Sequence, residues 1–321
     1  MAHVLLINTG GTIAMSEDHT TRKVSPTREN PIRQQGNFIN HFATVTFVDL
    51  FNLPSPHMTQ AQMLELSNYI RDHAGDYDGI VVTHGTDTLE ETAYFLQLNL
   101  NLSQAVVVTG AMRSSNEIGA DGMANLRSAI MAAAAPQSRD QGVLVVMNEE
   151  IHTATYVTKT HTTNLATFQT PTFGPIGLIS KNQVLYFQKI LHRDYYPVKE
   201  IKKPVALLKA YAGMQADIIT AIGASHYGGL VIEGLGAGNL PPATVPATEA
   251  LLAQGIPVVM VSRAFNGVIE DVYDYEGGGK QLKQAGVIFA QGLSGVKARL
   301  KLECLLNAES QVDLGQAFAW S

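Results

Sequence analysis

The stretch from Ile80 to Val108, IVVTHGTDTLEETAYFLQLNLNLSQAVVV, decides the fold class of this chain. It opens on one short apolar run, Ile80–Val82, and closes on another, Ala105–Val108. Residues 88–98 between them have the spacing of a helix. Two buried strands joined by a helix are typical of a parallel sheet with crossover connections, so this stretch predicts an α/β fold.

The same alternation extends in both directions along the chain. Further strands are expected at residues 4–7, 143–147, 205–208, 230–232, 258–261 and 287–290. Further helices are expected at residues 121–135, 215–225, 244–254 and 294–306. Most of these strands are apolar at every position, as strands covered by helices on both faces must be. The pattern therefore predicts a doubly wound, mostly parallel sheet.

One helix start is marked by its own capping residues. Thr59 and Gln62 have the spacing of a capping box. Met63, Leu66 and Ile70 then fall on one helix face, and Gly75 is a plausible stop.

The chain length favours two domains. Its 321 residues exceed the size, roughly 250 to 300 residues, at which a single core tends to split. The regular pattern lapses between residues 191 and 204, where the chain is charged and contains two prolines. We expect an N-terminal domain over 1–191, a linker over 192–203 and a C-terminal α/β domain over 204–321.

Composition and charge exclude several functional classes. The net charge is −6 and no long basic run is present, so a nucleic-acid partner is not expected. No apolar stretch approaches the roughly 20 residues that span a bilayer, and the segment after Met1 lacks the features of a signal peptide. The single cysteine, Cys304, rules out an intrachain disulfide and is expected on the packed side of a helix. We expect a soluble, cytoplasmic protein with no membrane partner.

Polar residues follow three successive predicted strands. They form the turns Thr9–Thr12, Thr83–Thr88 and Thr109–Arg113. Ligands in a parallel α/β sheet bind at the carboxyl ends of strands, so these turns predict one site. No Gly-x-Gly-x-x-Gly, His-x-x-x-His or clustered cysteines are present, so neither a dinucleotide cofactor nor a metal is expected.

Each residue of this candidate site also has a plainer interpretation. Thr12 could cap the segment that follows its glycine turn, and Thr86 or Asp87 could cap the helix that begins near Thr88. His84 fits a hydrogen-bonded structural histidine better than a base. Lys159 could be a surface charge, although hydroxyl residues surround it in the sequence. A threonine nucleophile needs a neighbouring base, which a lysine can provide.

Five segments together resemble the bacterial L-asparaginase family in their order and spacing. They are TGGTIA at 9–14, THGTDT at 83–88, TGAMR at 109–113, ADG at 120–122 and KTHTT at 159–163. The first two are highly specific as a pair, and the resemblance covers essentially the whole chain. It implies a cytoplasmic-type hydrolase of asparagine catabolism, with no cofactor and with a smaller, flavodoxin-like C-terminal domain.

The resemblance also implies roles for individual residues. Thr12 is the acylated nucleophile, supported by Thr86, Lys159 and Asp87. The substrate contacts that it implies are Gly11 and Thr86 through backbone N–H groups toward the oxyanion, Ser55 to the α-carboxylate, Asp87 to the α-amino group, and Ala111. The implied reaction forms an acyl-enzyme with loss of ammonia, followed by attack of water.

The family's sites are completed by the C-terminal domain of a neighbouring subunit, which implies a homotetramer built as a dimer of dimers. Asn239 matches an asparagine that supports the neighbour's site, and Asp274 and Glu276 are candidates for its carboxylate. This sequence departs from the family in two places. Residues 15–40 lack the tyrosine of the mobile segment, where Val24 or a nearby residue stands instead, and Pro56 replaces a glutamine of the secreted members.

Two other functions remain open on the sequence. One is a glutaminase-asparaginase of broader specificity, because one methylene changes binding by only ~1 to 3 kcal/mol. The other is a protein that keeps the fold and binds an amino acid without catalysis.

Overall fold

The structure is a computed structural model that describes residues 1–18, 20–21, 23–26, 32 and 42–319. It divides into two compact units, Met1–Tyr195 and Tyr196–Ser321. The two units are called unit 1 and unit 2.

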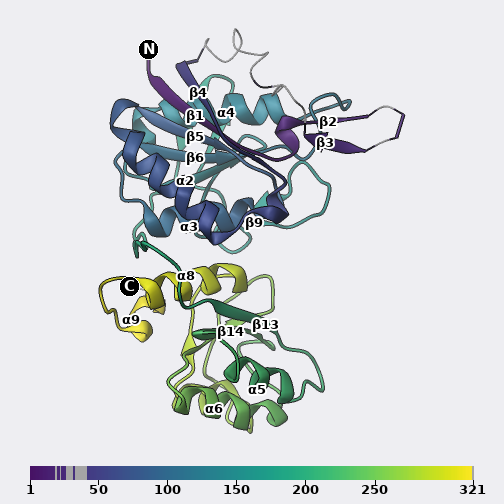
Figure 1. Cartoon of the computed structure of the whole chain (residues 1–321), viewed down its shortest axis with the longest axis vertical. Coiled ribbons are helices and arrows are strands. Elements are labelled where there is room, and N and C mark those ends of the chain that lie inside the picture. The colour runs from purple at the N-terminus through teal and green to yellow at the C-terminus, as the bar shows by residue number, and fades with distance from the viewer. Residues whose placement is uncertain (19, 22, 27–31, 33–41, 320–321) are drawn as a thin grey trace. The chain divides into compact units, whose positions relative to one another are not determined.

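Unit 1 is built on an eight-stranded sheet (Figure 1). Its order is β12 (Gln183–Tyr186), β11 (Gly177–Ser180), β8 (Glu150–Thr153), β7 (Val143–Met147), β6 (Ala105–Thr109), β5 (Gly79–Thr83), β1 (His3–Gly10) and β4 (Thr44–Leu53). The five strands from β7 to β4 pair in parallel. The other three extend the sheet antiparallel. The expected mostly parallel α/β sheet is confirmed.

Helices cover both faces of this sheet, as its uninterrupted apolar strands require. Val4 and Leu6 of β1 pack in the cluster that contains α4 (Gly122–Ala134). Leu5 and Ile7, on the other face, pack in the cluster that contains α2 (Gln60–His73) and α3 (Leu89–Asn99). The chain is therefore doubly wound around β1, β5 and β6.

Helix α2 begins at the capping box expected from its sequence. The Thr59 hydroxyl accepts from the Gln62 backbone N–H, and the Gln62 side chain accepts from the Thr59 N–H. Met63, Leu66 and Ile70 are buried, and the helix ends at His73 just before Gly75. A short 3-10 turn, η4 (Ala74–Asp76), follows.

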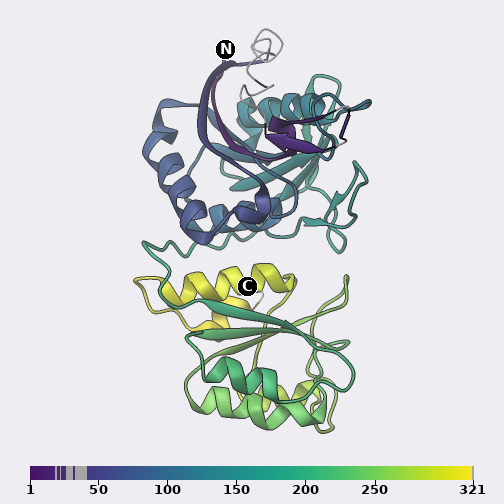
Figure 2. The ribbon, with the colours of Figure 1, turned by 45° about the vertical axis from the view of Figure 1, so that its right-hand side comes forward.

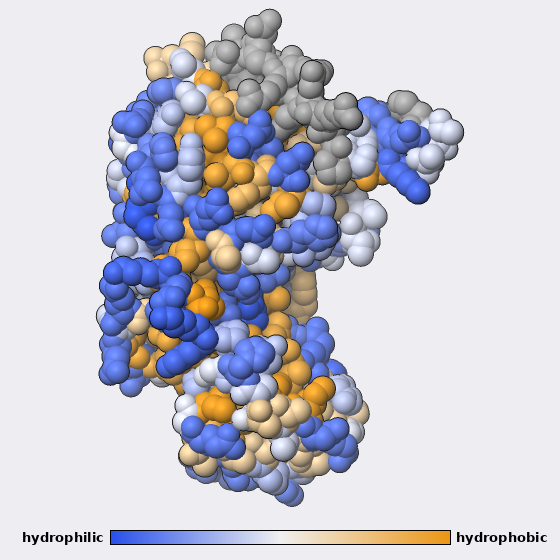
Figure 3. Space-filling view, viewed as in Figure 1, coloured by the Kyte–Doolittle hydropathy of each residue, from blue (hydrophilic) through white to orange (hydrophobic). Residues whose placement is uncertain are grey.

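Several strands of unit 1 were not predicted. β4 mixes apolar and polar residues, and it lies at the sheet edge with several apolar side chains half-buried. Figure 3 shows apolar surface in the region where Figure 1 places this strand. The remaining pairs are very short: β2 (Met15–Glu17) with β3 (Val24–Pro26), and β9 (Thr158–Lys159) with β10 (Phe168–Gln169). Pairs of two or three residues leave no periodicity to detect.

Unit 2 is a separate, smaller parallel sheet. Its strands are β13 (Val205–Lys209), β14 (Gly229–Gly234), β15 (Val258–Ser262) and β16 (Ile288–Phe289), in sequential order. Its helices are α5 (Asp217–Gly223), α6 (Val245–Ala253), α7 (Gly279–Gln284), α8 (Gly295–Asn307) and α9 (Leu314–Phe318). The connections between neighbouring parallel strands place α5, α6 and α7 on one face, and α8 and α9 cover the other. Figure 2 shows this sheet between green α5 and α6 and yellow α8.

Cys304 lies on α8 and is fully buried, as its position in the apolar pattern predicted. Among the described residues, no helix is both long and apolar enough to cross a membrane.

Candidate active site

The turn after β1 is anchored to its neighbouring strand by buried side chains. Thr9 Oγ1 donates to the Thr83 carbonyl at 2.8 Å. Thr83 Oγ1 in turn donates to Asn8 Oδ1 at 3.0 Å, and the same oxygen accepts from the Gly10 N–H at 3.2 Å. These bonds fix the ends of β1 and β5 to each other, so the two turns that follow these strands begin side by side.

The two turns touch through their glycines. Gly11 has φ of +86°, and a Cβ added to it would lie 2.3 Å from both Cα and N of Gly85. Only glycine allows this approach together with this backbone conformation. The contact brings the residue after Gly11, which is Thr12, to the turn that carries Thr86.

The Gly11 backbone N–H donates to the Leu53 carbonyl of the edge strand β4 at 3.0 Å. This bond engages the N–H that was expected to face the oxyanion, and that expected role stays a prediction. Gly11 serves the site through its close contact with Gly85.

Thr12 is not a helix cap. It opens the 3-10 helix η1 (Thr12–Ala14), whose N-cap is Gly11 with no side-chain cap bond. Thr12 is half-buried while Ile13 and Ala14 behind it are buried. The capping interpretation of this turn is therefore wrong.

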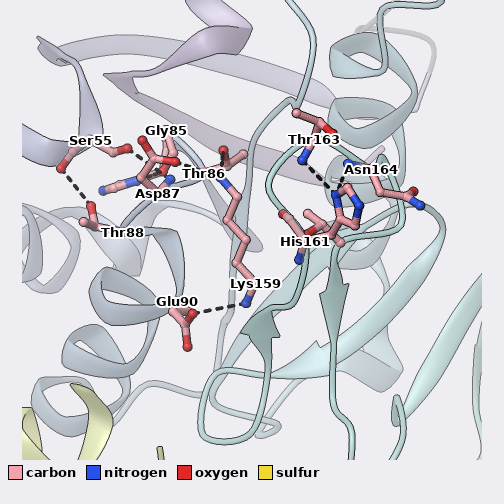
Figure 4. Close-up of polar contacts among 12 residues, drawn as sticks. Ser55, Gly85, Thr86, Asp87, Thr88, Glu90, Lys159, His161, Thr163 and Asn164 are labelled. Atoms are coloured by element: carbon pink, nitrogen blue, oxygen red, sulfur yellow. Dashed lines mark hydrogen bonds and ion pairs between the residues drawn. The ribbon is translucent and has the colours of Figure 1, made fainter. Parts of the chain in front are cut away.

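Lys159 reaches the turn after β5 and binds two of its side chains (Figure 4). Its Nζ lies 3.0 Å from Thr86 Oγ1 and 2.7 Å from Asp87 Oδ1. The Lys159 side chain is only 17% exposed, whereas that of Asp87 is 61% exposed. Lys159 is thus not a solvated surface charge, although 73 residues separate it from Thr86.

The capping interpretation of Thr86 and Asp87 is also wrong. The N-cap of α3 is Thr88, which makes no side-chain cap bond. Instead, Thr88 Oγ1 donates to the Ser55 carbonyl at 2.8 Å. The Asp87 carboxylate binds Lys159 instead of a helix N–H group. The side chains of Thr86 and Asp87 therefore both contact the lysine.

Ser55 belongs to the same cluster of side chains. It begins η3 (Ser55–His57) after β4 and is 5% exposed. Its Oγ accepts from the Asp87 N–H at 3.2 Å. Ser55 therefore fixes the backbone of Asp87, a contact that the sequence did not reveal.

His84 is a buried structural histidine, as expected. Nδ1 lies 2.8 Å from the Gly85 carbonyl, and Nε2 lies 2.9 Å from Thr92 Oγ1. Burial lowers the pKa of His84 to about 4. The neutral ring donates from Nδ1 to Gly85 and accepts the Thr92 hydroxyl proton at Nε2, so it holds the Gly85 turn against α3.

The turn after β6 is the third polar turn at the carboxyl ends of the parallel strands. Ala111 is fully buried there. Asp121, at the start of α4, accepts backbone N–H groups from Met112 and Arg113 at 3.0 to 3.1 Å. Because β6, β5 and β1 are neighbours in the sheet, the three polar turns lie at adjacent strand ends, as the sequence predicted.

Three expected residues lie in unit 2. Asn239 follows β14, and its Oδ1 accepts from the Gly279 N–H at 3.1 Å. Asp274 pairs with Lys280 at 2.5 Å, and Glu276 lies on the same exposed segment.

The expected lid segment is described only in part. Val24 lies in β3 opposite Glu17 and is 46% exposed. Most of residues 27–41 lies outside the described part of the chain. Within that part, no group of three or more His, Cys, Asp or Glu residues could hold a metal ion.

Sequence reasoning gave no role to Glu90 or Thr158. Glu90 Oε1 accepts from both Thr158 Oγ1 and the Lys159 backbone N–H. The one sequence signal for Glu90 was a carboxylate in the first turn of a helix, a feature that many surface helices share.

Comparison with known proteins identifies two matching family models. The model described as "Asparaginase, N-terminal" matches residues 3–192, and that described as "Glutaminase/Asparaginase C-terminal domain" matches residues 204–317.

Curated relatives match most of the chain. An L-asparaginase of Bacillus licheniformis is 37% identical over 94% of this chain and 95% of its own length. A probable L-asparaginase of Deinococcus radiodurans is 41% identical over 99% of this chain and 97% of its own length. A glutaminase-asparaginase of Pseudomonas aeruginosa is 30% identical over 83% of this chain and 77% of its own length.

Proposed function

This chain belongs to the asparaginase family of amidohydrolases, and we propose that it hydrolyses L-asparagine to L-aspartate and ammonia with Thr12 as the nucleophile. The observation that carries the proposal is the contact of Lys159 Nζ with Thr86 Oγ1 at 3.0 Å, on a turn that touches the Gly11–Thr12 turn.

A threonine hydroxyl must lose its proton in order to attack an amide at neutral pH. Thr86 and Lys159 supply a route for that proton, because a hydroxyl can pass a proton on to an amine with a free lone pair. The Asp87 carboxylate, 2.7 Å from Nζ, compensates the positive charge that Lys159 carries once it has accepted the proton.

In the proposed reaction, Thr12 Oγ forms a bond to the amide carbon while its proton moves toward Lys159. The amide nitrogen then takes up a proton and leaves as ammonia, and an ester between Thr12 and the aspartyl group remains. Water adds to this ester, and the bond to Oγ breaks to release aspartate and restore the hydroxyl.

The substrate's charged groups are assigned to the edge of the same site. Asp87 has an exposed carboxylate that can pair with an α-ammonium group, and Ser55 lies beside it for the α-carboxylate. Ala111 and the Thr86 backbone N–H complete the proposed contacts. Asparagine and glutamine both carry these two charged groups, so these contacts do not distinguish the two amides.

A glutaminase-asparaginase of broader specificity is the second candidate, favoured by the relative of that name in Pseudomonas aeruginosa. The rates of ammonia release from the two amides separate the candidates. We expect the higher kcat/KM for asparagine, and a higher value for glutamine would select the second candidate.

The decisive variant is Thr12→Ala. We expect it to lower kcat by at least ~100-fold, because the attacking oxygen is lost while the surrounding turn is kept. Mass spectrometry of wild-type enzyme quenched during turnover should show an aspartyl adduct on the peptide that contains Thr12. Calorimetric binding of asparagine to Thr12→Ala serves as the control for an intact site.

Near-normal turnover in Thr12→Ala would contradict the mechanism. Binding of asparagine without turnover in the wild-type protein would instead support a non-catalytic amino-acid-binding protein.

We also propose a cytoplasmic homotetramer in which Asn239, with Asp274 or Glu276, serves the site of a neighbouring subunit. The family resemblance supports this arrangement, and light scattering of the purified protein measures the number of subunits.

A further inference from the structure

We propose that Glu90 is a positioning residue, which clamps the β9 backbone so that the Lys159 side chain meets Thr86. This inference deepens the proposed function and rests on the role given there to Lys159.

One carboxylate oxygen of Glu90 binds two neighbouring groups of β9, and Figure 4 shows its bond to Lys159. Glu90 Oε1 accepts from Thr158 Oγ1 at 3.0 Å and from the Lys159 backbone N–H at 3.1 Å. Glu90 is only 9% exposed, so these bonds form largely away from solvent. Hydrogen bonds to a charged acceptor are the stronger kind.

Lys159 is thereby held at both ends by one five-residue segment. Thr86 and Asp87 bind its Nζ, and Glu90 binds its backbone nitrogen. All three residues lie between the end of β5 and the first turn of α3. The segment that carries the proposed proton relay therefore also fixes the backbone position of Lys159, the proposed base.

The ribbon that carries Lys159 is short. β9 has two residues, Thr158 and Lys159, which pair within the described residues with the two residues of β10. Val157 beside β9 and Phe168 of β10 pack in the core and anchor the ribbon there. The Glu90 carboxylate adds polar bonds at the two residues of β9 themselves, one of which is the lysine.

The position of Glu90 suits an ionised clamp. It is the second residue of α3, where backbone N–H groups and the helix dipole favour a carboxylate. The helix is held by other residues, because Leu89, Ala93 and Leu96 pack in the core. Loss of the carboxylate should thus release β9 without unfolding α3.

The test compares Glu90→Ala with Glu90→Gln, which keeps an acceptor oxygen at the same place. We expect Glu90→Ala to lower kcat by ~10- to 100-fold with KM within about threefold, because a small displacement of a catalytic group has effects of that size. Glu90→Gln should stay within about fivefold of wild type. Glu65→Ala, on the exposed surface of α2, is the control and should match wild type.

A second readout does not depend on the chemistry. Amide hydrogen exchange at residues 158–169 should speed up in Glu90→Ala and not in Glu90→Gln, while exchange in β5 and β6 stays slow. If Glu90→Ala does not fold, the pair Thr158→Val and Thr158→Ser tests the other side of the clamp. Only the serine variant should keep wild-type protection and rate.

Unchanged kcat and unchanged exchange in Glu90→Ala would overturn the positioning role. Equal losses in Glu90→Ala and Glu90→Gln would overturn it as well, since the acceptor would then not be what matters. The proposed function fails separately, when Thr12→Ala keeps its turnover. An inactive Thr12→Ala beside a fully active Glu90→Ala leaves the proposed function standing and removes only the clamp.

Discussion

His84 shows how one buried side chain can join two elements of the site. Its ring binds the Gly85 carbonyl on one side and the Thr92 hydroxyl on α3 on the other. Among the described contacts, none joins the His84 side chain to Lys159 or Thr12. Its contribution is therefore the geometry of the turn, and it is available only while the ring is neutral.

Stability should consequently depend on pH through His84. Burial lowers its pKa from 6.5 to about 4, so below pH 6.5 the unfolded chain binds this proton first. The stabilisation is complete above pH 6.5 and is lost as pH falls toward 4, by about 3 kcal/mol in all. Urea unfolding of wild type and His84→Asn at pH 7 and pH 4.5 measures this effect. A pH slope that is the same in both proteins would contradict it.

At the scale of elements, the site depends on the contact between two turns. Gly11 and Gly85 approach so closely that a single methyl group at Gly11 would overlap the Gly85 backbone. Because the first turn carries Thr12 and the second carries Thr86, their separation sets the distance between the proposed nucleophile and the proposed relay.

Gly11→Ala should therefore both destabilise and inactivate the protein. A positive φ of +86° and a Cβ 2.3 Å from Gly85 together should cost at least about 2 kcal/mol. Thermal unfolding and ammonia release measure the two effects. Gly75→Ala is the matched control, since its Cβ would meet nothing within 4 Å and should be neutral or slightly stabilising. Equal behaviour of the two variants would show that the turns need not touch.

At the scale of the whole molecule, the two units have separate cores. The clusters that contain α2, α3 and α4 draw only on unit 1, and those that contain α5 to α9 draw only on unit 2. A cavity made in one core should therefore lower the stability of that unit and leave the other unit folded.

Leu302→Ala in α8 and Leu126→Ala in α4 form a matched pair for this prediction. Each removes a fully buried leucine, at a cost of about 2 to 5 kcal/mol. The buried Cys304 thiol reports on unit 2, and amide exchange in β5 and β6 reports on unit 1. Leu302→Ala should expose the thiol at lower urea while β5 and β6 keep their protection, and Leu126→Ala should do the reverse. Simultaneous loss of both signals in either variant would mean that the units unfold together.

The amino-acid sequence by itself determined the α/β class, the principal parallel strands and helices, and the three polar turns. Apolar runs, capping residues and turn glycines act within a few residues of each other, so their pattern is visible along the chain. The edge strand β4 and the four-residue antiparallel strands β8, β11 and β12 were missed because they mix apolar with polar residues. The tertiary structure alone decided that Gly11 donates its N–H to Leu53, that Ser55 fixes Asp87, and that Glu90 binds a strand 69 residues away. Contacts at that separation depend on which strands lie side by side, and no local pattern specifies that order.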